Sequence, residues 1–393
     1  MVSQLSGPAG VYVHFPWCLQ KCPYCDFVSF ATERSAIDHR GYADAVLAEI
    51  AHRRRDLDGR PVGTIFFGGG TPSLWEPEEL GRVIDRLREV VAVDEDVEIT
   101  VECNPSSLDE ARARALRAAG ANRLSIGVQG LDRERLQFLG RLHDERGGLQ
   151  ALRDALASGI DRVSADVIYG VAGGRAQRVE EAADEVGRVA DTGVTHVSAY
   201  ALTIEPSTVF GDLARKGTLP ILQEDTVADA FLAVRAALEA RGFVHYEVSN
   251  YARPGHEARH NLGYWRGLDY VGLGCAAYGT VSTGDGRARR YRNRTDPQRY
   301  MAEALAGRSP EGSSEDLPAE TRLRERIMLG LRLAEGLDLG AAADDLGVPA
   351  WTNERRRAAD KLLRKGLLSM EGGRVRVPAT AWLLADGVAA ELF

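Results

Sequence analysis

Short apolar runs alternate with longer amphipathic stretches from residue 11 to about residue 250. The amphipathic stretches, such as YADAVLAEIAHRRR and EELGRVIDRLREVV, repeat apolar residues at the spacing of a helix face. The apolar runs are short and rich in β-branched residues, which is typical of buried strands. Six such runs are VYVHF (11–15), GTIFF (63–67), VEITVEC (97–103), RLSIGVQ (123–129), RVSADVI (162–168) and HVSAYAL (196–202).

Strands that alternate with helices pair in parallel through right-handed crossovers. The near-continuous apolar character of the six runs indicates a sheet that helices cover. We therefore expect an α/β fold, a partial (β/α)6 barrel over residues 1–250, although a doubly wound open sheet has the same periodicity. After the third run, Ser107 and Glu110 form a capping-box pattern, and Gly120 predicts the end of the helix that Ser107 begins.

The rest of the chain divides into three further segments. We expect residues 251–306 to extend the barrel with additional strands, and the polar, Ser/Glu-rich residues 307–320 to form a linker. Residues 321–393 show three helical patterns and a β-like tail, an order typical of a winged helix. DNA binding is not expected, because residues 315–393 hold 12 Lys/Arg against 13 Asp/Glu and offer little phosphate neutralisation.

The composition is that of an ordinary soluble globular protein, with 44% hydrophobic and 27% charged residues. No apolar run approaches the roughly 20 residues of a membrane-spanning helix. MVSQLSGPAG lacks the basic and apolar regions of a signal peptide, and a net charge of −8 argues against a general nucleic-acid surface. We expect a cytoplasmic protein that does not bind nucleic acid.

Three of the five cysteines gather in CLQKCPYCDF, directly after the first predicted strand. In a reducing compartment, Cys18, Cys22 and Cys25 at this spacing indicate metal binding rather than disulfides. The loop lies at the carboxyl end of a strand, where β/α barrels place their chemistry. Cys103 and Cys275 stand alone and are expected to be small buried residues.

Two kinds of metal site fit this loop. Zinc prefers four tetrahedral ligands, and His14 could complete a Cys3His set. An iron–sulfur cluster held by three thiolates leaves one iron free to bind a small molecule. Further polar residues, among them Glu102, Gln129, Asp166 and Tyr200, recur at the ends of later predicted strands, as a barrel active site requires.

The cysteine spacing at the end of the first strand resembles that of the radical SAM superfamily. This resemblance implies a radical SAM barrel with a 4Fe-4S cluster on Cys18, Cys22 and Cys25. It also implies that the open iron binds the amino and carboxylate groups of S-adenosylmethionine, which an electron from the cluster can cleave.

The motifs VYVHFPWC, FFGGGTPS, ECNP, SIGVQ, DVIYG and YEVSNYA resemble, more closely, the oxygen-independent coproporphyrinogen-III oxidase family. The resemblance covers residues 11 to about 280 and is weaker in the C-terminal domain. It implies one or two S-adenosylmethionine positions lined by Tyr12, Tyr24, Gly69, Gly70, Thr71, Glu102, Gln129, Arg141, Asp166 and Ala201.

Two features depart from the oxidases of that family. The oxidases carry C-x-x-x-C-x-x-C-x-C and a substantial N-terminal arm, whereas here Phe27 takes the last position and Cys18 follows only 17 residues. RHNLGYW resembles instead the HNxxYW signature of the heme-chaperone branch. The resemblance implies a heme site formed by His260, Asn261, Tyr264 and Trp265, in which the imidazole suits iron and the rings can pack on a porphyrin.

Two main functional hypotheses follow. In the first, the protein is a heme chaperone with a 4Fe-4S cluster and S-adenosylmethionine that passes heme to acceptor proteins; self-association as a homodimer and peripheral membrane contact through an acceptor are compatible with it. In the second, it is a radical SAM oxidase that decarboxylates porphyrinogen propionates. A zinc-containing β/α hydrolase is a third alternative.

RARRYRNR (287–294) could pair with heme propionates or form a solvated edge. No catalytic residue is assigned.

Overall fold

A twelve-stranded sheet organises the protein, whose computed structural model describes residues 7–57 and 59–393. The order of its strands is β14-β13-β12-β11-β1-β4-β5-β6-β7-β8-β10-β9. The six predicted strands form its centre and pair in parallel, as the partial barrel requires. They are β1 (Ala9–Phe15), β4 (Val62–Gly69), β5 (Val93–Cys103), β6 (Arg123–Gln129), β7 (Arg162–Tyr169) and β8 (His196–Ala201).

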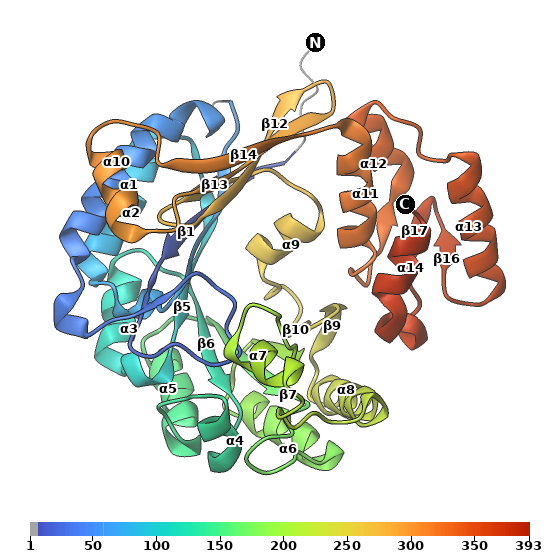
Figure 1. Cartoon of the computed structure of the whole chain (residues 1–393), viewed down its shortest axis with the longest axis horizontal. Helices are drawn as coiled ribbons and strands as arrows, with labels where there is room; N and C mark the ends of the chain where they lie inside the picture. The colour runs from blue at the N-terminus through green and yellow to red at the C-terminus, as the bar shows by residue number, and fades with distance from the viewer. Residues whose placement is uncertain (1–6, 58) are drawn as a thin grey trace.

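Helices cover the outer face of this curved sheet (Figure 1). Val11, Val13 and Phe15 of β1 are fully buried in the core on that side. Because successive side chains of a strand point to opposite faces, Tyr12 and His14 point toward the barrel interior. The helices of the barrel region are α1 (His39–Arg53), α2 (Pro77–Val90), α3 (Glu110–Ala118), α4 (Arg133–Phe138), α5 (Glu145–Ala157), α6 (Val179–Ala190), α7 (Val209–Arg215) and α8 (Glu224–Glu239).

Additional strands extend the sheet at both edges. On one side β11 (Tyr270–Leu273) pairs in parallel with β1, and β12 (Tyr278–Gly284), β13 (Arg287–Asn293) and β14 (Glu311–Leu317) continue in antiparallel order. On the other side lie β10 (Asn250–Ala252) and β9 (Val244–Glu247). The short helix α9 (Arg259–Trp265) lies between these two extensions in Figure 1, and α10 (Pro297–Leu305) packs beside α1.

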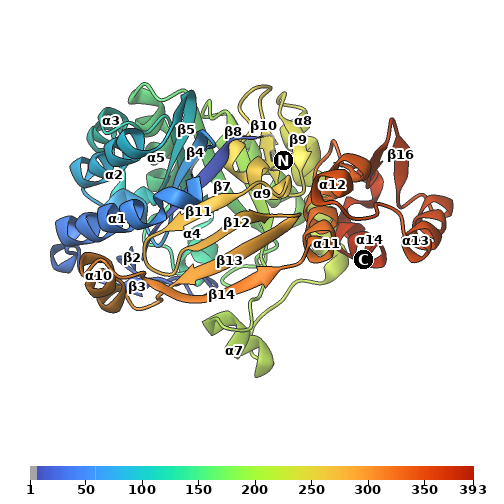
Figure 2. The ribbon, with the colours of Figure 1, turned by 90° about the horizontal axis from the view of Figure 1, so that it is seen from above.

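The C-terminal domain has the elements of a winged helix. Its helices are α11 (Ala319–Gly330), α12 (Leu339–Leu346), α13 (Asn353–Arg364) and α14 (Ala385–Glu391). The three-stranded antiparallel sheet consists of β15 (Leu337–Asp338), β17 (Arg374–Arg376) and β16 (Ser369–Glu371), in that order. The domain lies at one side of the barrel, while α7 projects from the barrel's edge (Figure 2).

Two local predictions were wrong. The segment 307–320, expected to be a linker, contains β14, because cross-strand ion pairs such as Arg290–Glu315 (3.5 Å) stabilise a strand of polar residues. The N-cap of α3 is Asp109, whose carboxylate accepts from the N–H of Arg112 (2.7 Å). Ser107 instead forms a hydroxyl–hydroxyl hydrogen bond with Ser73.

No helix in the described part of the chain combines the length and the apolar character needed to cross a bilayer.

Candidate functional site

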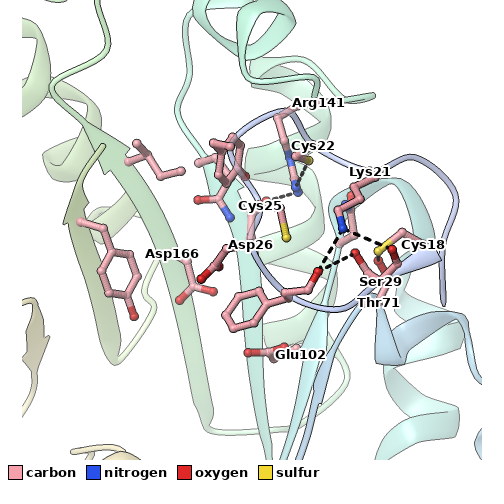
Figure 3. A pocket seen from close by; sticks show the side chains of 18 of the residues that line it. Cys18, Lys21, Cys22, Cys25, Asp26, Ser29, Thr71, Glu102, Arg141 and Asp166 are labelled. Atoms are coloured by element: carbon pink, nitrogen blue, oxygen red, sulfur yellow. Dashed lines mark hydrogen bonds between the residues drawn. The ribbon is translucent and has the colours of Figure 1, made fainter. Parts of the chain in front are cut away.

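A cavity of about 460 Å³ opens at the carboxyl ends of the parallel strands, a volume typical of small-molecule sites (Figure 3). The cysteine loop forms one wall, and the ends of β4 to β8 form the others. Of the residues expected to bind the cluster or S-adenosylmethionine, those that line the cavity are Cys18, Cys22, Cys25, Tyr24, Gly69, Gly70, Thr71, Glu102, Gln129, Arg141, Asp166 and Ala201. Tyr12 does not line it.

The three thiols of the loop are free and partly buried. Thr71 Oγ1 donates to Cys18 Sγ (3.4 Å), and Arg141 Nη1 donates to Cys22 Sγ (3.6 Å). Burial raises the pKa of Cys18, and that of Cys25 to about 11, so metal binding there must release protons. Within residues 7–57 and 59–393, no three His, Cys, Asp or Glu side chains are close enough together to hold one metal ion. The loop offers three soft sulfur donors around one cavity, the ligand type that iron–sulfur clusters take.

His14 supports the loop from behind and does not complete a zinc site. Its Nε2 donates to the carbonyl of Val28 (2.8 Å), and the hydroxyl of Tyr12 lies 3.0 Å from its Nδ1. Burial lowers the pKa of His14 to about 4, so the ring is neutral. With both nitrogens in hydrogen bonds, His14 leaves the Cys3His alternative without its fourth ligand.

The glycines at the end of β4 allow the strand end to pack against the cysteine loop. A Cβ on Gly70 would lie 2.6 Å from the carbonyl oxygen of Trp17. Gly69 has φ +110°, and a Cβ there would lie 2.6 Å from the ring of His14. The N–H of Thr71 donates to the Trp17 carbonyl (2.8 Å). These residues fix the loop's entry as well as lining the cavity.

Two carboxyl groups lie at the inner end of the cavity. Glu102 accepts from the N–H of Gly69 (3.1 Å), and Asp166 accepts from the hydroxyl of Ser125 (3.1 Å). Burial raises the pKa of both groups, that of Glu102 to about 8, and the charge of Asp166 adds to the rise at Glu102. Such buried acids can accept hydrogen bonds from hydroxyl or amino groups of a ligand.

Gln129 is the last residue of β6, and Arg141 lies just after α4. Arg141 Nη2 donates to the carbonyl of Gly127 (2.7 Å), which holds the guanidinium beside the cysteine loop. Gln129 has φ +66°, a left-handed conformation that is uncommon for a residue with a side chain and is often found at functional sites. The strand end is thus bent where it meets the cavity.

Several residues that line the cavity were not predicted from the sequence. Lys21 Nζ donates to the carbonyls of Phe27 (3.2 Å) and Ser29 (3.4 Å) and closes the cysteine loop on itself. Asp26 and Glu205 add acidic groups at the cavity. For Lys21 and Asp26 a signal existed, because both lie within the cysteine motif.

The HNLGYW residues lie on α9, away from this cavity. Their helix packs against the beginnings of β1 and β4, whereas the cysteine loop follows the end of β1. The carboxylate of Glu98 accepts from the backbone N–H groups of Arg259 (3.1 Å) and His260 (3.0 Å) and anchors the first turn. The predicted heme residues and the predicted cluster residues therefore occupy opposite ends of the strands.

His260 is buried, and both of its ring nitrogens are in hydrogen bonds. Thr64 Oγ1 lies 2.8 Å from Nδ1, and the hydroxyl of Tyr264 lies 2.9 Å from Nε2. Burial lowers the pKa of His260 to about 3, which keeps the ring neutral, the state in which it can ligate iron. A cavity of about 160 Å³ adjoins His260 and Tyr264, smaller than typical ligand pockets. Heme ligation by His260 therefore requires Tyr264 to release Nε2 and α9 to shift.

Three of the five arginines of residues 287–294 pair with acidic side chains. Arg289 pairs with Glu311, Arg290 with Glu325 (2.7 Å), and Arg294 with Glu303 (3.0 Å). These pairs serve the sheet extension, which supports the interpretation of this run as a solvated edge.

Comparison with known proteins adds independent evidence. Residues 12–186 match the sequence profile of the radical SAM superfamily, and residues 317–384 match that of the HemN C-terminal domain. The chain is 38% identical to the heme chaperone HemW of Escherichia coli (strain K12), over 84% of this chain and 83% of that protein. It is 37% identical to the heme chaperone HemW of Mycobacterium tuberculosis (strain ATCC 25618 / H37Rv), over 97% and 94%.

Two further relatives extend the comparison. Radical S-adenosyl methionine domain-containing protein 1, mitochondrial, of Bos taurus is 34% identical over 84% of this chain and 74% of its own. The structure of coproporphyrinogen III oxidase (HemN) from Escherichia coli superposes with a TM-score of 0.81 over 98% of this chain and 90% of its own, at 24% identity. That superposition confirms the radical SAM fold.

Proposed function

The chain belongs to the HemW family of heme chaperones within the radical SAM superfamily, and from this premise we propose that it binds heme and transfers it to acceptor proteins. The observation that carries the proposal is the similarity to curated heme chaperones over most of their length. The presence of RHNLGYW on α9 supports it.

The protein carries, on this proposal, a 4Fe-4S cluster on Cys18, Cys22 and Cys25. Three unpaired thiols on one wall of the cavity fit such a cluster. When bound, the cluster supplies an open iron for S-adenosylmethionine and an electron for its cleavage.

S-adenosylmethionine is assigned to the same cavity. Arg141 offers a cation to its carboxylate, and Glu102 and Asp166 offer acceptors to its amino and hydroxyl groups. Tyr24, Gly69, Gly70, Thr71, Gln129 and Ala201 complete the proposed walls. Tyr12 is proposed to act from behind, through His14.

The oxidase alternative is disfavoured at one position. Phe27, at the place of the fourth cysteine of the oxidases, is 58% exposed at the cavity. A phenyl ring there cannot perform thiol chemistry.

Heme is assigned to His260, Asn261, Tyr264 and Trp265 on α9. The neutral His260 ring supports iron ligation once Tyr264 has moved away. Acceptor proteins, a homodimer and peripheral membrane contact through an acceptor are further proposals. We also propose a cytoplasmic location, with which the absence of disulfides among the described cysteines is consistent.

The experiment is anaerobic cluster reconstitution followed by parallel assays with heme and coproporphyrinogen III. We expect stoichiometric heme binding without decarboxylation. His260→Ala should weaken heme binding at least tenfold and leave the iron and sulfide content unchanged. His52→Ala, which alters an exposed histidine of α1, is the matched control. Decarboxylation of coproporphyrinogen III, or equal heme affinity in the His260 variant, would contradict the proposal.

A further inference from the structure

Residues 332–335, which follow α11, form one of the contacts between the C-terminal domain and the barrel. The N–H of Val248 donates to the carbonyl of Arg332 (3.1 Å). Glu247 and Leu333 form an antiparallel bridge next to this bond. The segment therefore pairs with the end of β9 through its backbone, which fixes the position of its side chains.

Side chains of this segment contact the carboxyl end of α9. The guanidinium carbon of Arg332 lies 5.5 Å from the ring centre of Trp265, and Glu335 pairs with Arg266 at 3.1 Å. The turn after α9 is close to α11, because a Cβ on Gly267 would lie 2.9 Å from a side chain of that helix. The barrel thus holds the first turn of α9, and the C-terminal domain holds the last.

Two N–H donors at this contact have no acceptor among the described residues. They are Trp265 Nε1 and Arg332 Nε, and both atoms are buried. A buried donor without an acceptor costs free energy. Six other arginine Nε atoms of the described residues are in the same state, so the indole N–H of Trp265 is the more distinctive of the two donors. Arg332 uses only Nη2 for an ion pair, with Asp386 (2.6 Å), and its side chain is 27% exposed. Because Nε itself is buried, a ligand must displace part of this contact to reach it.

The carboxyl group of Glu247 lies at the same contact between the C-terminal domain and the barrel. Its polar neighbours are Ser249 and Asn250, and among the described residues it forms no hydrogen bond with Arg332 or Trp265. Burial raises the pKa of Glu247 to about 7, against the opposing charge of Arg332. While Glu247 is protonated, it does not repel a carboxylate that approaches Arg332 and Trp265.

We propose that Arg332 Nε and Trp265 Nε1 together bind a carboxylate of the ligand, a propionate when heme is bound at α9. The inference rests on the proposed function and assigns the C-terminal domain a direct part in it. Neighbouring N–H donors suit the two oxygens of a carboxylate, and an arginine strengthens such bonds by its charge. Three of the five arginines of 287–294 are, by contrast, engaged by glutamates, whereas Arg292 lies over the ring of Tyr278.

The test is titration of the full-length chain with heme and with heme dimethyl ester, which lacks free carboxylates, followed by Soret absorbance. Arg332→Ala should lower heme affinity about tenfold, the value of one charge-assisted hydrogen bond, and change ester affinity less than about twofold. Trp265→Phe keeps a ring but removes the N–H, and should also weaken binding of heme more than of the ester. Arg324→Ala, on α11 and paired with Glu320 at the surface, is the control and should change neither.

Each other outcome overturns the inference. Equal losses for heme and ester mean that Arg332 only shapes α9, and unchanged affinities in both variants mean that the pair does not touch the ligand. Trp265→Phe provides the decisive comparison if Arg332→Ala does not fold. If the wild-type chain binds the ester but not heme, the carboxylate site is wrong and the proposed heme site still stands. If it binds neither, the proposed function is wrong.

Discussion

Gly70 packs so closely against the cysteine loop that one added methyl group tests whether this packing positions the cysteines. A Cβ there would meet the carbonyl oxygen of Trp17 at 2.6 Å, and this backbone atom cannot rotate away. The N–H of Gly70 also donates to the carbonyl of Phe15 (2.7 Å), which holds the two segments together. We expect Gly70→Ala to destabilise the protein by about 1–3 kcal/mol. Iron and sulfide analysis after anaerobic reconstitution should show cluster content reduced by more than half.

Gly81→Ala is the matched control. Gly81 lies within α2, and a Cβ there would come no closer than 3.5 Å to Ala119. Replacing a glycine inside a helix by alanine stabilises it by roughly 0.5–1 kcal/mol, so this variant should keep full cluster content. Full cluster content in Gly70→Ala as well would mean that this close packing does not position the cysteines.

At the scale of single residues, the sequence predicted which side chains line the cavity better than it predicted their conformation. Glu102 and Asp166 line it because the ends of parallel strands meet at one edge. The left-handed backbone of Gln129 was not predictable, since no glycine or asparagine marks it. Tyr12 lies behind the cavity because it shares a strand face with His14 and bonds to it.

At the scale of elements, periodicity predicted the six parallel strands but not the polar ones. EGSSEDL has no apolar alternation, and β14 forms because β13 offers arginines to its glutamates. The position of α9 could not be predicted from the sequence either. A seven-residue helix is placed by tertiary contacts, such as the hydrogen bond from the N–H of His260 to Glu98. Elements held by long-range polar contacts therefore escaped prediction.

The end of β9 should make stability depend on pH through Glu247. Burial raises its folded-state pKa to about 7, above the value of about 4.5 expected in the unfolded chain. The folded state therefore holds the proton more tightly, and the corresponding stability is present below pH 4.5 and lost as pH rises to about 7. Gln cannot ionise. In Glu247→Gln the free energy of unfolding should therefore fall over this pH range by up to about 3 kcal/mol less than in the wild-type chain. Urea unfolding between pH 5 and 8 measures it.

Glu239→Gln provides the comparison for this prediction. Glu239 is the last residue of α8 and forms an exposed pair with Arg235 (2.7 Å), so its removal should change stability by less than about 1 kcal/mol and keep the pH dependence of the wild type. If Glu247→Gln unfolds with the same pH dependence as the wild-type chain, Glu247 is ionised in the folded state throughout this range.

At the scale of the whole molecule, the barrel separates two proposed sites along its strands. The cysteine loop follows the end of β1, and α9 packs near its beginning. Seven residues of strand span roughly 20 Å, and the rings of Phe66 and Tyr12 lie between His260 and His14. The structure therefore allows one site to be removed without distorting the other.

Single and double substitutions test this separation. Cys22→Ala should lose the cluster, because three thiolates are needed, yet keep heme affinity within about twofold, since the Cys22 sulfur bonds to Gly140 and Arg141 at the other end of the strands from α9. His260→Ala should do the reverse, and the double variant should show both losses without an added effect, as expected for distant, independent sites. Iron content and heme titration, with circular dichroism as a check on folding, measure the three variants. A loss of heme binding in Cys22→Ala would show instead that heme depends on the cluster end of the barrel, and would move the proposed heme site from α9 to the large cavity.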